Sequence, residues 1–198
     1  MIDLSIFLAE HPYIDHSSPR IRAKAGELFS GIESSLERTR IAYEFVRDEI
    51  PHSFDIGSDA ITARASDVLA RGTGICHAKA ALLRGVGIPA GFCYQHITLA
   101  DDDSLGYCIH CYNAVHVEGR WIFLDARGNA GGRQALFSPG KPILAYPNRS
   151  EYDEYFWKGI YASPQMGVMR MLDAAVTRQD VIDNLQDYIE GEPDIPGW

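Results

Sequence analysis

The chain has 198 residues, a length that one domain with one hydrophobic core usually accounts for. Apolar residues make up 46% and charged residues 23%, so the composition is that of a folded globular protein rather than of a disordered segment. The 27 acidic and 18 basic residues give a formal net charge of -9, which argues against nucleic acid as a partner because phosphate binding needs clustered cations.

No stretch has the pattern of an export signal or a membrane span. Asp3 and Glu10 interrupt the apolar N-terminus, and no window approaches the roughly 18 apolar residues that a spanning helix needs. We therefore expect no membrane association and place the protein in the cytoplasm, where thiols stay reduced. Catalysis, metal binding or core packing, rather than disulfides, is then expected of the four cysteines, which are Cys76, Cys93, Cys108 and Cys111.

Helical patterns come first along the chain, strands follow, and helical patterns return at the end, which predicts an α+β fold. Ser18 before Pro19 is a typical helix start. A second helix is expected from the capping-box position Ser34 to about Pro51, and a short third helix from Ser66.

Three strands are predicted in the middle of the chain, over residues 90–100, 107–117 and 120–127. An acidic turn separates the first two strands. Glu118 and Gly119 connect the last two strands, and a connection of two residues has the length of a hairpin turn. Residues 128–132 are expected to end the sheet as a loop.

Residues 145–198 are expected to form a helical extension. Thr177 and Asp180 resemble a capping box, and apolar residues up to Ile189 repeat at helical period. The aromatic-rich stretch 152–161 is interpreted as core packing, with covering of a cleft as the alternative.

Cys76 follows a glycine turn and precedes a run of strong helix formers, so it is expected at a helix N-terminus. The unpaired amides there favour a thiolate and an oxyanion. On residue type alone a buried structural thiol is an equally good interpretation. His52 and Ser53 are polar candidates for a second oxyanion donor, whereas Lys79 and Arg84 are expected to face solvent.

A cysteine nucleophile needs a general base, and the base needs an orienting group. The chain has seven histidines. His77 is adjacent to Cys76 in the expected helix, and adjacent helical side chains point about 100° apart, so His77 is a poor partner.

The predicted hairpin offers a better base. With a two-residue loop, Val117 opposes Arg120, and this register places His110 and Asp125 on one face of the sheet as diagonal neighbours. We therefore predict His110 as the base and Asp125 as its orienting residue. A structural polar pair at a strand end is the alternative.

At these residues the sequence resembles the transglutaminase-like superfamily, relatives of the papain-like thiol enzymes. Three stretches match in order: GICHAKA with LLRGVGIPAG, then HCYNAVHVEGRW, then FLDARGN. The resemblance is strongest over residues 41–129 and implies a papain/transglutaminase-like fold, in which N-terminal helices with the nucleophile helix pack on an antiparallel sheet. It also implies Cys76 as the nucleophile, His110 as the general base and Asp125 as the residue that orients it.

The sequence departs from the family pattern at two places. Eight positions separate Cys76 from Arg84, about one helical turn fewer than is usual in the family. An acidic residue is common four positions after the histidine, and here Ala114 stands there. These departures keep open the alternative of a catalytically inactive interaction domain on the same fold.

We expect residues 1–198 to form one domain that acts as a cysteine-dependent acyl-transfer enzyme on an amide bond of a peptide or protein. Hydrolysis is expected over crosslinking, because water is always present unless a site excludes it. No cofactor and no metal is expected. Tyr112 and Asn129 are predicted to lie near the substrate.

A metal site is the remaining alternative, because Cys108 and Cys111 form a CxxC pattern around His110. The pattern lies within a predicted strand, which would point the two thiols to opposite faces and so disfavours zinc. A thioredoxin-like redox role is less favoured still, because its CxxC should open a helix.

Overall fold

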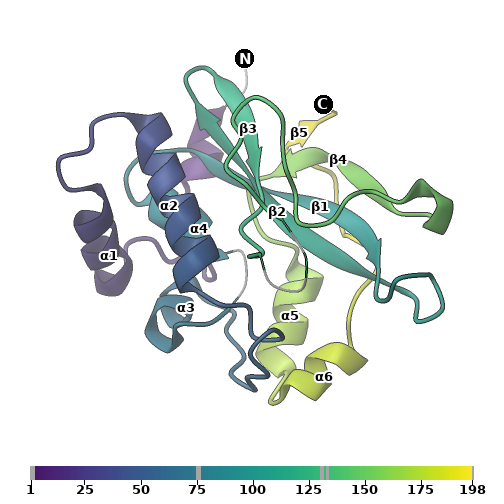
Figure 1. The fold of residues 1–198 in the computed structure, drawn as a ribbon. Coiled ribbons are helices and arrows are strands. Elements are labelled where there is room, and N and C mark those ends of the chain that lie inside the picture. The colour runs from purple at the N-terminus through teal and green to yellow at the C-terminus, as the bar shows by residue number, and fades with distance from the viewer. Residues whose placement is uncertain (1–2, 75–76, 130–131, 133, 198) are drawn as a thin grey trace.

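The computed structural model describes residues 3–74, 77–129, 132 and 134–197, in which helices pack against a curved antiparallel sheet (Figure 1). The helices are η1 (Leu4–Leu8), α1 (Pro19–Phe29), α2 (Ser35–Glu49), α3 (Ala65–Arg71), α4 (His77–Arg84), η3 (Ser150–Tyr152), α5 (Met166–Ala174) and α6 (Arg178–Asp183). The strands are β1 (Ala90–Thr98), β2 (Tyr107–Val117), β3 (Arg120–Leu124), β4 (Tyr155–Tyr161) and β5 (Ile195–Pro196). The sheet has the order β3-β2-β1-β4-β5, and the predicted α+β fold is confirmed.

The predicted helix starts are confirmed by their caps. The Ser18 hydroxyl accepts the backbone N–H of Ile21, and the Ser34 hydroxyl accepts that of Glu37, each at 3.3 Å. These bonds satisfy amides that the first turn of a helix leaves without a partner. The helix α3 begins at Ala65, one residue before the expected start.

The hairpin between β2 and β3 has the predicted register, with Val117 paired with Arg120 and His116 with Trp121. Its loop residues Glu118 and Gly119 have φ values of 54° and 76°. Two consecutive positive φ values are typical of a type I′ turn, whose twist matches that of paired strands. The turn therefore sets which side chains of β2 and β3 share a face.

The main core lies between α1, α2, α3, α4 and one face of the sheet. Its larger fully buried side chains are Ile21, Tyr43, Leu82, Leu83, Phe92, Ile122 and Leu124. The opposite face of the sheet carries a smaller cluster around Phe7, Cys93, Tyr112 and Ile160, which is covered by η1.

Arg84 does not face solvent as expected. Only 4% of it is exposed, and its guanidinium donates to the carbonyls of Ala9 (2.8 Å), Ala90 (2.6 and 3.0 Å) and Ala162 (2.5 Å). Burial lowers the pKa of Arg84 to about 10. The expectation failed because two of these carbonyls, those of Ala9 and Ala162, belong to segments distant in sequence, which reach the end of α4 only in the folded chain.

Residues 145–198 do not form a purely helical extension, because β4 pairs with β1 and β5 with β4. The sheet therefore does not end at residues 128–132 as expected. The aromatic stretch 152–161 supplies β4, with Tyr161 paired with Phe92 and Trp157 with Tyr94. A three-stranded sheet would leave the edge of β1 without hydrogen-bond partners, and β4 covers it.

The predicted capping box of Thr177 and Asp180 is confirmed, but α6 ends at Asp183 rather than near Ile189. The carbonyl of Gln186 accepts the backbone N–H of Ile109 on β2 at 2.9 Å, which holds the chain after α6 beside the sheet. The helix therefore does not continue to Ile189, although the apolar residues of the sequence repeat at helical period up to that point.

The helices α5 and α6 pack below the sheet on the loop before α3 (Figure 1). Buried Met169, Leu172 and Val181 form a cluster with Tyr13, whose hydroxyl donates to Asp173 on α5. No helix in the described part of the chain is both long and apolar enough to cross a membrane.

Candidate active site

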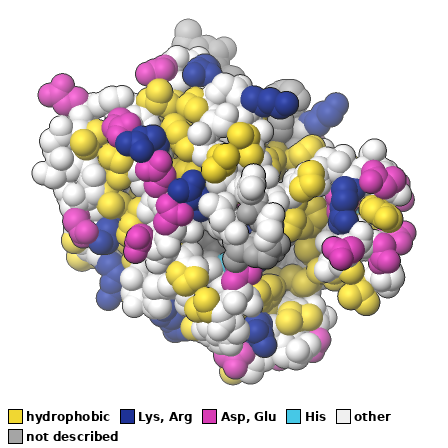
Figure 2. Space-filling model, in the orientation of Figure 1, with side chains coloured by type: hydrophobic (Ala, Val, Ile, Leu, Met, Phe, Trp, Pro, Cys, Tyr) yellow, Lys and Arg dark blue, Asp and Glu magenta, His cyan; other side chains and the backbone are white. Residues whose placement is uncertain are grey.

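His110 and Asp125, predicted as partners from the hairpin register, lie in hydrogen-bond contact. His110 Nε2 is 2.8 Å from Asp125 Oδ2, and the side chains are 7% and 0% exposed. The histidine is the fourth residue of β2, and the aspartate directly follows β3. A small part of one histidine side chain is visible near the middle of the face shown in Figure 2.

Hydrogen bonds from several described residues orient the Asp125 carboxylate. Besides the contact with His110, Oδ2 accepts the backbone N–H of Ala145 at 2.8 Å, and Oδ1 accepts that of Arg127 at 3.0 Å. Backbone donors from two segments leave the carboxylate little freedom to rotate. The imidazole of His110 is held in turn, as a general base requires.

The segment Ala145–Tyr146 and Gln95 are parts of the site that the sequence did not reveal. The Tyr146 ring packs edge-on against the His110 ring, with centroids 4.8 Å apart. Gln95 is the β1 partner of His110, and its Nε2 donates to the Tyr146 carbonyl at 3.2 Å. The register between β1 and β2 would have placed Gln95 opposite His110. The long loop between these strands does not fix that register, so the sequence did not predict it. Tyr146 lies in an irregular segment without periodicity.

Cys76 lies outside the described residues, and its predicted role as nucleophile stays a prediction. The described helix α4 begins at the next residue, His77. On the other side, Gly74 is packed so closely that an added Cβ would lie 2.5 Å from Thr62 Oγ1 and 2.6 Å from a methyl carbon of Val68. Position 74 therefore requires glycine.

Two of the other cysteines are poorly suited to nucleophilic attack. Burial raises the pKa of Cys93 well above its usual value, and burial together with Glu154 raises the pKa of Cys108 to about 11. A thiol must ionise to attack a carbonyl, so both would stay protonated near neutral pH.

The CxxC pattern lies in β2, as predicted, which places Cys108 and Cys111 on opposite faces of the sheet. Among the described residues no group of three or more histidine, cysteine or acidic side chains is arranged to hold a metal ion. These observations give the zinc alternative no support in this part of the chain.

Tyr112 and Asn129 were predicted near the substrate. Tyr112 is 1% exposed and packs against the rings of Phe123 and Phe156. Asn129 is exposed, and its Oδ1 accepts the backbone N–H of Ala135 at 2.9 Å. These contacts explain both residues structurally, and a role in substrate binding stays a prediction.

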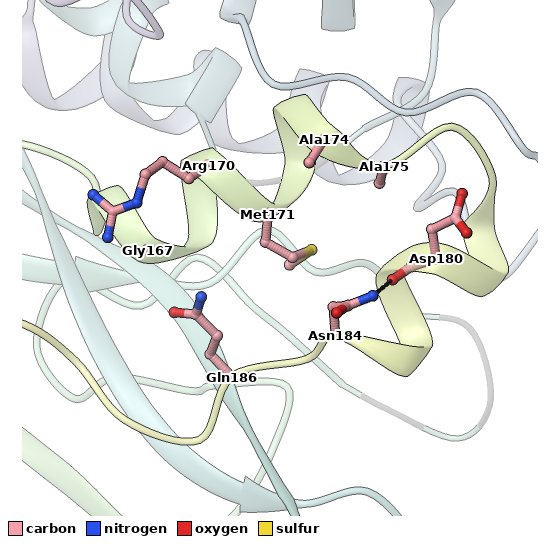
Figure 3. Close-up of a pocket in the computed structure, with 8 residues that line it drawn as sticks. All are labelled: Gly167, Arg170, Met171, Ala174, Ala175, Asp180, Asn184 and Gln186. Carbon is pink, nitrogen blue, oxygen red and sulfur yellow. Dashed lines mark hydrogen bonds between the residues drawn. The ribbon is translucent and has the colours of Figure 1, made fainter.

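A surface pocket of about 430 Å³ lies between α5 and α6 (Figure 3). Its lining residues include neither His110 nor Asp125. Its charged side chains have partners, because Arg170 pairs with Glu190 and Asp180 accepts backbone amides at the start of α6. We therefore assign the chemistry to the His110 region and not to this pocket.

The sequence matches the family model of the transglutaminase-like superfamily over residues 22–126, just over half of the chain. The match begins in α1 and ends just after Asp125, so it includes all three residues predicted to be catalytic. No protein of curated function is similar enough in sequence to count as a relative.

The solved structures similar to this one include two that are described as proteases. The crystal structure of a "putative cysteine protease" from Cytophaga hutchinsonii has a TM-score of 0.51 and 22% identity, over 63% of this chain and 42% of that chain. A "putative protease" from Parabacteroides distasonis has a TM-score of 0.39 and 15% identity, over 61% of this chain and 24% of that chain. This chain thus corresponds to less than half of either structure. The first similarity shows a shared fold, and the second is too weak to support an argument.

Proposed function

This chain belongs to the transglutaminase-like superfamily, and on that basis we propose that it is a thiol enzyme in which Cys76 attacks an amide or peptide bond. The observation that carries this proposal is the buried hydrogen bond between His110 and Asp125. From the resemblance of the sequence motifs, we assign these residues the roles of the family's base and orienting acid. A buried, oriented imidazole is the partner that a cysteine nucleophile needs.

In the proposed reaction His110 takes the proton of the Cys76 thiol, and the sulfur adds to the carbonyl carbon of the substrate. Asp125 contacts Nε2, which assigns the proton exchange with sulfur to Nδ1. The imidazolium then protonates the leaving amine as the C–N bond breaks, and a thioester remains. Water, deprotonated by His110, attacks the thioester, and the acid and the thiol are released.

We propose hydrolysis rather than crosslinking, with a peptide or protein amide as the substrate. Attack by a primary amine on the same thioester would give transamidation, so the two outcomes differ only in the acceptor. Water is present in any site that does not exclude it.

The proposal is tested by iodoacetamide labelling between pH 5 and pH 9, with each modified cysteine identified by mass spectrometry. At pH 5.5 we expect Cys76 to react about tenfold faster than the other cysteines, because a paired imidazolium keeps its thiolate ionised. His110→Ala should remove this advantage at pH 5.5 and leave the rate at pH 9 nearly unchanged. Equal labelling of all cysteines in the wild type would contradict an activated nucleophile.

The same preparations are then incubated with casein and a fluorescent primary amine. We expect new carboxyl groups without incorporation of the amine, and loss of this activity in Cys76→Ala but not in Cys108→Ala. Incorporation of the amine would show that the acceptor is an amine and that crosslinking is the reaction.

A further inference from the structure

An ion pair between Arg127 and Asp55 joins two loops that flank the candidate site. Arg127 Nη1 lies 2.5 Å from Asp55 Oδ2, and Nη2 lies 3.0 Å from Oδ1. The side chains are 9% and 20% exposed, and the residues are 72 positions apart in the chain. A bidentate pair shielded from solvent constrains geometry more strongly than a surface ion pair.

The Arg127 end of this ion pair is connected directly to the His110–Asp125 contact. The backbone N–H of Arg127 donates to Asp125 Oδ1 at 3.0 Å. Burial acts to lower the pKa of Arg127, but hydrogen bonding to Asp55 and the nearby Tyr146 hydroxyl raises it more. Movement of Arg127 would therefore disturb the carboxylate that orients His110.

The Asp55 end is connected to the segment that precedes Cys76. Asp55 lies in a turn over residues 53–57, shortly after Pro51, and its backbone N–H donates to the His52 carbonyl at 2.9 Å. The Pro51 carbonyl accepts the Thr73 hydroxyl at 2.9 Å and the Gly74 N–H at 3.4 Å. Gly74 is two residues before Cys76, so the turn links the approach to the nucleophile with the ion pair.

A second bond strengthens the same connection. The Ser53 and Thr73 hydroxyls are 3.2 Å apart, and Ser53 also accepts the backbone N–H of Ser58 through its carbonyl at 3.0 Å. The turn is thus closed on itself and bonded to the chain before α4. Hydrogen bonds thus connect the turn that carries Asp55 with Thr73.

We infer that the Asp55–Arg127 ion pair is a positioning pair that sets the separation between Cys76 and the His110–Asp125 contact. The inference rests on the proposed function of Cys76 as the nucleophile. In this proposal the ion pair takes no part in the bond-forming and bond-breaking steps. It acts by holding the loop before the nucleophile against the turn that carries the orienting aspartate.

The test is Asp55→Asn, which removes the charge and keeps the shape of the side chain. The rate of Cys76 alkylation at pH 5.5 should fall about tenfold, equivalent to a rise of about one unit in the thiol pKa. The rate at pH 9 should stay within about twofold, because an ionised thiol needs no imidazolium there. Asp55→Glu should keep most of the rate at pH 5.5.

Arg127→Gln and the double variant Asp55→Asn/Arg127→Gln provide a second measurement. If the two residues act as a pair, the double variant should be no slower at pH 5.5 than the slower single variant. Fully additive losses would show independent roles and overturn the inference.

The matched control is Glu154→Gln, which breaks the shielded Arg149–Glu154 pair at the start of β4 (2.7 Å). This control should lower the melting temperature and leave the ratio of the rates at pH 5.5 and pH 9 unchanged. The same pattern in Asp55→Asn would overturn the positioning role while the proposed function stands. Absence of rapid labelling at pH 5.5 in the wild type would overturn both.

Discussion

Gln95 is a buried residue with a definable task beside His110. Its Nε2 donates to the Tyr146 carbonyl. The segment Ala145–Tyr146 supplies the backbone N–H that donates to Asp125 and the ring that packs on His110. Its Oε1 is buried and has no hydrogen-bond partner among the described residues. A buried acceptor without a partner costs about 1–3 kcal/mol, so this side chain is poorly explained by stability alone.

Gln95→Met keeps the volume of the side chain and removes both the NH₂ group and the carbonyl oxygen of its amide. We expect the free energy of unfolding in urea to change by less than about 1 kcal/mol, because the lost hydrogen bond is offset by removal of the unsatisfied oxygen. Alkylation of Cys76 at pH 5.5 should slow severalfold, because Tyr146 is no longer held against His110.

Gln165→Met is the matched control, because Gln165 is also buried and its Oε1 accepts the Glu190 N–H at 2.7 Å. This variant should lose about 1–2 kcal/mol of stability and keep the wild-type rate of Cys76 alkylation. A slower alkylation in both variants would mean that Gln95 acts only through general stability.

The joining of β4 to β1 depends on Glu154, which directly precedes β4. Its Oε1 accepts the backbone N–H and the hydroxyl of Thr98, each at 3.0 Å, and pairs with Arg149 at 2.7 Å. Burial acts to raise the pKa of Glu154, but the bonds from Arg149 and Thr98 lower it more, to about 2. The carboxylate form is therefore the form that stabilises this junction.

Because the pKa of Glu154 is lower in the folded chain than in the unfolded chain, its stabilisation is present above about pH 4.5 and is lost as the pH falls towards 2. Between pH 6 and pH 2 the stability advantage of the wild type over Glu154→Gln should shrink by about 3 kcal/mol. Urea unfolding at several pH values measures this difference. The exposed Arg170–Glu190 pair provides a control, because Glu190→Gln should change the free energy of unfolding by less than about 1 kcal/mol.

Elements that depend on local signals were predictable from the sequence. The caps Ser18 and Ser34 bond within their own first turns, and the two-residue loop 118–119 determines the hairpin register by itself. His110 and Asp125 were predicted together for this reason. That register brings the two residues to the same face of the sheet.

Elements that depend on distant partners were not predictable in this way. The strand β4 exists because β1 has an open edge, and α6 ends early because Gln186 bonds to Ile109 on β2. Gln95 and Tyr146 meet His110 through the pairing of β1 with β2 and through an irregular loop. Periodicity along one segment contains no information about such contacts.

Arg84 joins four parts of the folded chain. From the last residue of α4 it donates to carbonyls after η1, at the start of β1 and after β4, at Ala9, Ala90 and Ala162. The C-terminal end of a helix carries a partial negative charge, which also favours a cation there. The helix that directly follows Cys76 is thus anchored at its far end to both the first and the last third of the chain.

Arg84→Met retains an apolar stem and removes all of these donors. Replacing a buried cation by an apolar side chain relieves a desolvation penalty of several kcal/mol, but it leaves three carbonyls without this donor, at about 1–3 kcal/mol each. We expect the second effect to prevail and the free energy of unfolding to fall by about 2–4 kcal/mol. The free energy of unfolding of Arg84→Lys should lie between those of the wild type and Arg84→Met. One ammonium group cannot reproduce all the hydrogen bonds of the planar guanidinium. A methionine variant as stable as the wild type in urea would show that water or a shift of the chain satisfies these carbonyls, and that Arg84 does not hold the four segments together.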